Sequence, residues 1–319
     1  MPGVSKPDRL INGPYVHAIG WTRKQDHSGC VATRSTWAGL ANSFDFDGVG
    51  GYRLKDETPV TCPTDISLPV MRSSGVARAR SAAKATVFAA LLGKQLLETV
   101  SDRENYHGHR VGVAVASSSA ITPIAWEFEA VGLRKGWDKT DTLLLPSSIP
   151  SAITTQTSAV FDTHAAAIAF QDGIFGVCAA IEYAHLSFAH QRSDYFLIIG
   201  AEEVCQIQCS ALAALGDQRP WIDSAAGLVL SGVPNSAGDW QLALCGNSVE
   251  GMAQVLPEEW TGATTLEIDI ESSATLFSAP LVPYALHHLF VNAPGKAVLS
   301  CRLPGRGKYV LGFTQHASC

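Results

Sequence analysis

The sequence predicts an α/β protein with a layered core of sheet and helices, and three observations support this. A chain of 319 residues is long enough for two domains or for one large layered body. Apolar runs of strand length alternate with segments of helical spacing along most of the chain. One stretch, 162–205, has the pattern of a strand, a tight turn, a long helix and a second strand, which is typical of a βαβ unit.

This βαβ stretch organises the rest of the prediction. Residues 163–171 (THAAAIAFQ) are apolar on both faces, which predicts a strand in the middle of a sheet rather than at a solvated edge. Asp172 and Gly173 interrupt the run, and helical spacing continues from 174 to 188. Residues 194–200 (DYFLIIG) form a second strand-like run that a glycine ends. The turn is therefore expected at a helix N-terminus, where such units place their chemistry.

The remaining elements are predicted from the same periodicities. Further strands are expected at 15–21, 110–116, 225–231, 241–247, 266–270, 296–303 and 308–314. Further helices are expected at 73–100, 123–135, 151–161 and 279–290, with a helix or loop after residue 205 that reaches 215. Each half of the chain thus ends in a βαβ-plus-hairpin arrangement.

Charge and hydropathy exclude several classes of function. Charged residues make up 16% of the chain, so we expect a partner or the other half of the chain to cover much of the surface. The net charge of −6, with no run of lysine or arginine, gives no footprint for nucleic acid or an acidic membrane. The first residues lack the apolar core of a signal peptide, and no run approaches the ~20 apolar residues of a spanning helix. These features predict a soluble cytoplasmic protein.

The cysteines point to packing rather than to a metal site. Eight are scattered along the chain, mostly in apolar segments, where buried and reduced thiols are expected. Cys205 and Cys209 form a CxxxC pair, but no second pair or histidine motif follows at zinc-site spacing. We therefore expect no metal and no other cofactor.

With these elements placed, the sequence resembles the β-ketoacyl synthases of the thiolase fold. The resemblance covers most of 70–231 and rests on the order and spacing of an arginine- and alanine-rich helix (72–97), a strand that ends in a small-residue loop (110–119), the block 126–150, the strand and acidic turn DYFLIIGAEE (194–203) and the strand 225–231. It implies a layered αβαβα thiolase-like fold of two related βαβ halves. We expect the halves at 1–205 and 206–319, with the second half shortened.

The resemblance also locates a missing nucleophile. Active members carry a cysteine in the turn before the central helix, where the helix N-terminus stabilises the thiolate that attacks an acyl thioester. Counting along the matching segments places this position at Ile174. A slip of one or two residues would put Gly173, Asp172 or Phe175 there, and none of these can carry a thioester. The nearest thiol, Cys178, lies one helical turn further on.

The two histidines that the family uses in its second half are missing as well. Neither an HGTGT-like loop nor the family's lysine-to-GH segment is present. His287 and His288 lie in an apolar helix and are expected to be ordinary helix residues. His164, at the start of the central strand, is expected to be a hydrogen-bonded or interface residue rather than a base.

These departures predict a protein resembling a chain length factor, a ketosynthase-like subunit without the catalytic cysteine. The resemblance implies pairing with a catalytic ketosynthase across the central strand, with an acyl carrier protein as an indirect partner. An obligate interface of this kind resembles a domain core cut in half. The predicted dimer strand includes His164, Ala165, Ala167 and Ala169, and the predicted walls or gates of an acyl tunnel are Phe161, Phe170, Ile174 and Phe175.

Two other interpretations remain open from the sequence. The chain could be an independent acyltransferase or condensing enzyme of thiolase fold that uses Cys178 or one of Ser117–Ser119 as nucleophile, although no GxSxG elbow is present. It could also be a homodimeric scaffold or a docking module for a carrier protein. The sequence leaves open the acyl product and the identity of the partner.

Overall fold

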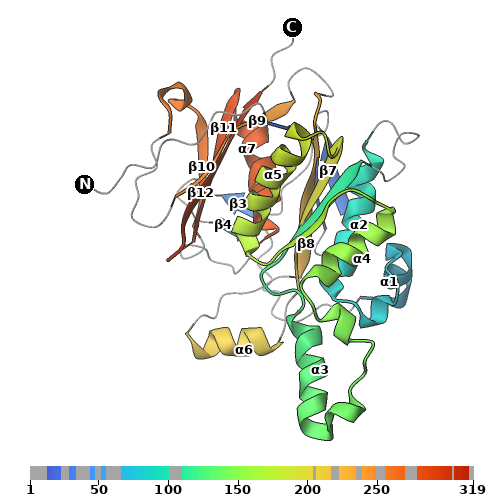
Figure 1. The fold of residues 1–319 in the computed structure, drawn as a ribbon. Coiled ribbons are helices and arrows are strands. Elements are labelled where there is room, and N and C mark those ends of the chain that lie inside the picture. The colour runs from blue at the N-terminus through green and yellow to red at the C-terminus, as the bar shows by residue number, and fades with distance from the viewer. Residues whose placement is uncertain are drawn as a thin grey trace.

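The structure is a computed structural model, viewed as a ribbon in Figure 1. It describes residues 13–22, 29–33, 44–46, 52–54, 66–100, 110–203, 206–216, 223–234, 239–248, 256–269, 279–303 and 305–315. Its helices are α1 (Leu68–Ser74), α2 (Lys84–Glu98), α3 (Thr122–Lys135), α4 (Ser151–Phe161), α5 (Gly173–Ala189), α6 (Gln206–Ala214) and α7 (Leu281–Asn292). Short 3-10 turns are η2 (Ala79–Ser81), η3 (Trp137–Lys139), η4 (Leu145–Ser147) and η5 (Glu258–Trp260).

The described strands form one ten-stranded sheet and a separate two-stranded pair. The order across the large sheet is β10-β11-β12-β9-β1-β8-β7-β5-β6, and β2 pairs with β1 beside this path. Its strands are β1 (Tyr15–Thr22), β2 (Gly29–Thr33), β5 (Val111–Ala116), β6 (Ala167–Phe170), β7 (Tyr195–Glu202), β8 (Ser224–Ser231), β9 (Trp240–Ser248), β10 (Thr264–Asp269), β11 (Lys296–Leu303) and β12 (Gly307–Gln315). The small pair is β3 (Phe44–Phe46) with β4 (Tyr52–Leu54).

Two groups of four strands repeat one pairing pattern. In the order β5-β7-β8-β1, the first pair is parallel and the next two are antiparallel, and β10-β11-β12-β9 follows the same sequence of directions. A short antiparallel pairing of β1 with β9 joins the groups. Two related halves, each with a βαβ crossover and a closing hairpin, are thus built into one sheet. The predicted boundary between the halves, after residue 205, stays a prediction. The strand β8 lies after this boundary in the sequence, but it pairs with β7 and β1, which precede the boundary.

The two halves stack in layers, with α5 and α7 between them (Figure 1). Successive residues of β5 show how the layers form, because side chains alternate across a strand. Ala114 and Ala116 face the inner apolar cluster that contains α5 and α7, whereas Val113 and Val115 face an outer cluster built with α2. This arrangement confirms the predicted thiolase-like α/β class.

The outer face of the second half has a thinner cover than that of the first. A small apolar cluster there consists of Leu244, Val298 and Val310 packed with Trp260, the last residue of η5. Within the described ranges, a 3-10 turn and its neighbours stand where α2 and α4 stand on the first half. The predicted shortening of the second half stays a prediction.

The structure corrects the position predicted for the central strand. Only Ala167–Phe170 of the predicted 163–171 form β6, and β6 is the last strand of the sheet rather than a middle one. Asp162 ends α4 in a left-handed conformation, and Thr163 donates to Ser158 O, so the chain reaches the sheet late. The run is apolar on both faces because α4 and α5 lie against β6, not because strands flank it.

The predicted helix 73–100 is also corrected, because it is divided into three pieces. Gly75 ends α1 with φ 78°, and Arg78 begins η2 with φ 54°, so the backbone is left-handed at two places. The small-residue periodicity does predict α2, whose Ala85, Phe88 and Leu92 are buried against the sheet.

Two helices lie apart from the sheet at the foot of the molecule in Figure 1, α3 and α6. Gly136, with φ 96°, ends α3 and starts η3, and the position of Gly132 lets the Trp137 ring fold back onto α3. Within the described ranges, no helix combines the length and apolar character that a bilayer crossing requires.

Candidate functional site

The candidate site lies at the carboxyl ends of the parallel strands β5, β6 and β7, the edge at which open α/β sheets place ligands. After β6, Asp172 precedes α5 and Gly173 begins it with φ 48°, a left-handed value that suits glycine. The backbone joins this turn to the end of β5, because Ser117 N donates to Phe170 O over 2.9 Å and Gly173 N to Ser117 O over 3.4 Å. The predicted position of the turn, at a helix N-terminus, is confirmed.

Ile174 occupies the second residue of α5 and is completely buried. It belongs to the inner cluster between the halves, with Phe175 and Val177 as neighbours in α5. A residue that attacks a thioester must present a nucleophilic atom to its substrate. Ile174 presents only a hydrocarbon side chain in an apolar surrounding.

An arginine from the second half covers this turn. Arg306, in the β11–β12 connection, donates two hydrogen bonds to the Asp172 carboxylate, one of them 2.7 Å from Nη2 to Oδ2. Its guanidinium carbon lies 5.9 Å from the centre of the Phe175 ring. Tyr309 of β12 contacts the same ring edge-on at 5.8 Å. The start of α5 is therefore contacted by side chains that the second half supplies.

Beside the turn, three serine hydroxyls enclose one buried carboxylate. Ser118 donates to Glu202 Oε1 from its backbone N (2.8 Å) and from its Oγ (2.7 Å). Ser117 and Ser119 donate to Oε2 at 3.1 and 3.3 Å, and Ala279 N lies 3.4 Å from Oε1. Glu202 has no exposed surface. The five donors hold together the ends of β5 and β7 and the approach to α7.

This cradle decides the role of the serine triplet. Burial raises the pKa of the Glu202 carboxyl, while hydrogen bonds from Ser118, Ala279 and Ser117 oppose the shift. A serine nucleophile needs a base that accepts its proton and a free path to the substrate. Here all three hydroxyls point to a buried carboxylate, and Ser117 Oγ also accepts from Ser119 N and Ala120 N. The geometry supports a structural role.

Glu203, the next residue, caps a helix. Its Oε2 accepts from Lys84 N at 2.6 Å and lies 3.4 Å from Ala85 N, at the first turn of α2. Burial, followed by the nearby Asp223 carboxyl, raises the pKa of Glu203 to about 7. The end of β7 thus carries two buried acids, one that binds the serine loop and one that binds α2.

Cys178, the thiol nearest to the turn, is fully buried in the second turn of α5. Its Sγ lies 3.9 Å from Cys301 Sγ of β11. Burial raises its pKa well above that of a free thiol, so the attacking thiolate is disfavoured. No group of three metal-ligand side chains occurs within the described ranges. Cys205 and the Cys209 side chain, which form the predicted CxxxC pair, lie outside the described residues.

The histidines singled out in the sequence lie away from any shared arrangement. His287 is buried on α7, and its ring packs on Trp21 at 4.7 Å, while His288 is half-buried on the same helix. His164 is exposed in the segment before β6, with Nε2 3.2 Å from Asp162 Oδ1. His164 and Ala165, both predicted in the dimer strand, precede β6 rather than lie in it.

Comparison with known proteins supplies the fold assignment. No protein-family model matches the chain, and no curated protein matches it in sequence. Among solved structures, the ishigamide ketosynthase/chain length factor aligns with 96% of this chain and 100% of its own, at a TM-score of 0.67 and 10% identity. A beta-ketoacyl synthase from Burkholderia phymatum STM815 aligns with 96% of this chain and 100% of its own, at a TM-score of 0.62 and 13% identity. A third similar structure is that of a type II PKS acyl-carrier protein in complex with its ketosynthase bound to the hexaketide. It aligns with 95% of this chain and 99% of its own, at a TM-score of 0.63 and 13% identity.

The chain has the ketosynthase fold. At these identities the likeness concerns the arrangement of elements, which agrees with the resemblance to β-ketoacyl synthases and chain length factors stated from the sequence.

Within the ketosynthase fold, the four predicted tunnel residues do not share one space. Ile174, Phe175 and Phe170 belong to the inner cluster between the halves. Phe161 lies on the other face of the sheet, in the outer cluster, where its ring fills the space that a side chain at Gly93 would need. The structure thus brings three of the candidates together and separates the fourth.

Neither the Glu202 cradle nor the Arg306–Asp172 pair was predicted from the sequence. One signal for the cradle was present, because serines follow one strand of a parallel pair and glutamates follow the next. The carboxyl ends of neighbouring parallel strands meet at one edge. No comparable signal marks Arg306, which lies 134 residues from Asp172 in the chain.

Proposed function

We propose that this protein is a non-catalytic ketosynthase-like subunit, of the chain length factor kind, that pairs with a catalytic ketosynthase in acyl chain elongation. The buried Ile174 at the start of α5 is the observation that carries the proposal. It stands where the sequence resemblance places the nucleophile, and Arg306 pairs with Asp172 two residues earlier and lies against the ring of Phe175, the next residue. A catalytic cysteine at this position would need an open path for its thioester.

The alternative nucleophiles receive little support. Cys178 is a buried thiol with a raised pKa, and the serine triplet is engaged by Glu202. The proposal therefore assigns the chemistry to a partner subunit and a steric role to this chain.

Among the described strands, β6 is paired on one edge only, and its other edge supports pairing with that partner. The carbonyl of Ala166 accepts from Val113 of β5 and that of Phe170 from Ser117 just after β5, and backbone groups alternate in direction along a strand. The N–H and C=O groups of Ala167 and Ala169 therefore point to the open edge, and Ala167 is exposed. An apolar strand with an open edge is a template for another chain. Antiparallel addition of a partner's strand would continue the sheet through a dimer.

Apolar side chains on the α3–η4 segment extend the surface that a partner would cover. Several large apolar side chains there are about half exposed or more. Exposed apolar side chains gathered in one region of a surface are typical of an interaction site. They are Trp126 (51%), Leu133 (75%), Trp137 (58%), Leu143 (47%), Leu145 (51%) and Ile149 (49%). The same segment leads directly into α4 and β6 along the chain.

In the proposed dimer this subunit helps to shape the acyl tunnel of its partner, with Ile174, Phe170 and Phe175 as candidate wall residues. The acyl chain arrives on a carrier protein, and the complex works in the cytoplasm. A polyketide, polyene or fatty-acid product is compatible with the proposal.

Co-expression with a catalytic ketosynthase tests the proposal. We expect a stoichiometric complex, and we expect Ala167→Asp to abolish it because a carboxylate would lie at the pairing edge. Ala213→Asp, at an exposed position of α6, is the matched control and should leave the complex intact. The isolated chain should show no acyl adduct by intact mass after incubation with an acyl-carrier thioester. An adduct on Cys178, or a soluble complex of the Ala167→Asp variant, would contradict the proposal.

A further inference from the structure

Among the described strands, the second half of the sheet has no counterpart of β6. The groups β5-β7-β8-β1 and β10-β11-β12-β9 repeat one pattern of directions, and β6 extends this pattern in the first half by pairing with the outer side of β5. No described strand lies on the same side of β10, which is the last strand at that end of the sheet. The outer edge of β10 therefore corresponds to the edge of β5 on which β6 lies.

The connection from β10 to α7 is too short to cover this whole edge. Residues 117–172 connect β5 to α5 and include β6, whereas only residues 270–280 connect β10 to α7. A parallel neighbour needs a crossover of about a dozen residues in addition to its own strand. An antiparallel neighbour would run back along β10, although α7 starts at the carboxyl end of β10 because it leads to the parallel strand β11. A strand of that length and a turn leave roughly three residues for a return of about 17 Å, which is beyond their reach.

The edge of β10 has none of the common devices that protect an open strand. Its sequence, TTLEID, contains no lysine and no proline, and its pairing with β11 runs without a bulge. Both of its acids are paired inside the second half. Glu267 lies 3.2 Å from Lys308 Nζ, and Asp269 lies 3.8 Å from Arg302 Nη1. The strand thus presents a backbone edge with compensated charges, which favours pairing with another strand.

The side chains of β10 fit a second copy of the same strand. Leu266 and Ile268 face the inner cluster and are almost completely buried, whereas Thr265 is exposed and Glu267 is half-buried. Two antiparallel copies related by a two-fold axis keep their inner faces on one side when Leu266 lies opposite Leu266. In that register Thr264 lies opposite Ile268. Thr265 of each copy lies opposite Glu267 of the other, so a neutral hydroxyl faces each carboxylate.

Other registers are less favourable. A shift by one residue places inner side chains opposite outer ones. A shift by two residues in one direction places Glu267 opposite Glu267, and like charges directly opposite each other are destabilising. A shift by two residues in the other direction leaves only residues 264–266 of β10 in the ladder. One register thus combines a nearly full ladder with apolar contact and no opposed like charges, and this self-complementarity favours a second copy over an unrelated strand.

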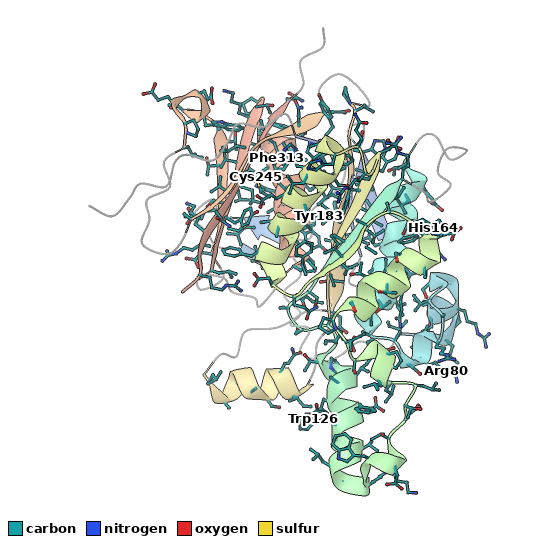
Figure 2. The ribbon with its side chains drawn as sticks, viewed as in Figure 1. Arg80, Trp126, His164, Tyr183, Cys245 and Phe313 are labelled. Atoms are coloured by element: carbon teal, nitrogen blue, oxygen red, sulfur yellow. The ribbon has the colours of Figure 1, made fainter. Side chains whose placement is uncertain are left out.

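We propose that this chain binds a second copy of itself through antiparallel pairing of the two β10 edges. This contact is separate from the β6 edge assigned to the ketosynthase. In the view of Figure 2, Tyr183 of α5 lies between two residues of the second half, Cys245 and Phe313, and His164, which precedes β6. Both edges can therefore be occupied, and the complete assembly contains two copies of this chain and two of the ketosynthase. The self-association goes beyond the proposed function and occurs in the isolated chain as well.

Analytical ultracentrifugation of the isolated chain tests the proposal with two substitutions of opposite charge at one exposed position. Thr265→Glu places a second carboxylate opposite Glu267 of the other copy and should weaken self-association at least about tenfold, because a two-fold dimer contains two such pairs. The matched control Thr265→Lys places an ammonium there and should keep the dissociation constant within about twofold of the wild type or lower it. Ala167→Asp, which changes the β6 edge, should leave self-association intact.

Hydrogen exchange gives a second measurement. The amides of β10 should become more protected as the concentration of the wild-type chain rises, and Thr265→Glu should remove this dependence. Protection at every concentration would overturn the proposal, because it would place a segment of the same chain on the edge. A wild-type chain that stays monomeric, equal effects of the two Thr265 substitutions, or a self-association that only Ala167→Asp removes would overturn it as well.

The complex with the ketosynthase separates this proposal from the proposed function. Thr265→Glu should still bind the ketosynthase through β6, but the complex should contain one copy of each subunit instead of two. Its mass in solution reports the β10 contact, and its subunit ratio reports the β6 contact. A wild-type complex with one copy of each subunit would overturn the β10 contact and leave the ketosynthase pairing in place.

Discussion

Arg306 in the β11–β12 connection binds both carboxylate oxygens of Asp172 at the start of α5, and this pair joins the second half to the turn that precedes Ile174. Arg306 also lies over the Phe175 ring. Bidentate pairing fixes direction as well as distance, so it orients the connection over the turn.

Removing this pair should loosen the turn more than it destabilises the protein. Both side chains are more than a third exposed, so we expect Arg306→Ala to lower the free energy of unfolding by no more than about 1 kcal/mol. Hydrogen exchange at the amides of Gly173 and Ile174 should become faster. The control Arg302→Ala breaks a pair with Asp269 at 3.8 Å and should leave exchange at α5 unchanged. Equal exchange in both variants would show that Arg306 does not restrain the turn.

The Glu202 cradle should be a major source of local stability. Glu202→Ala leaves the buried hydroxyls of Ser117 and Ser119, and the exposed hydroxyl of Ser118, without this acceptor, so we expect a loss of about 3 kcal/mol in chemical denaturation. Glu127→Ala, at an exposed position of α3, should cost less than about 0.5 kcal/mol. A Glu202→Ala variant as stable as the control would mean that the cradle is not required for folding.

Glu203 should make the stability depend on pH. Its pKa in the folded protein is about 7, above the ordinary value of 4.5, so the folded state binds more protons than the unfolded state between these values. Its contribution is therefore fully present below about pH 4.5 and is lost as pH rises through 7, with an upper size of about 3 kcal/mol.

Denaturation of the wild type and of Glu203→Gln at several pH values measures this contribution. The variant should show a smaller fall in stability between pH 5 and pH 8, although Glu202, whose pKa is also raised by burial, leaves a part of the slope. An identical slope in both proteins would contradict the assignment to Glu203.

The proposed tunnel wall leads to a test of product length. In the reconstituted pair, Phe175→Ala should lengthen the product, because an aromatic ring in a dense interior excludes a further two-carbon unit. Forcing that unit into the packed space costs about 1–3 kcal/mol. The middle of that range corresponds to roughly a tenfold change in the ratio of termination to elongation. Phe161→Ala is now a suitable control, since its ring lies in the outer cluster beside Gly93. Product analysis by mass spectrometry should show a shift for Phe175→Ala alone. If an active Phe175→Ala pair gives unchanged lengths, this ring is not part of the wall.

Much of the fold followed from the sequence. Periodicity placed β5, α5 and β7 within a few residues, because each element buries an apolar face whose spacing is local to its own segment. The resemblance placed Ile174 at the turn before α5 by counting along contiguous segments, and the structure places it in the second position of that helix.

Only the tertiary structure decided how these elements meet. Apolar residues on both faces of 163–171 could not distinguish a middle strand from an edge strand covered by two helices, since either removes the same side chains from water. The contacts that shape the site join residues far apart in the chain, with a separation of 84 positions for Ser118 and Glu202 and of 134 positions for Asp172 and Arg306. Local patterns carry no information about such pairs, because their partners are set by how the two halves pack.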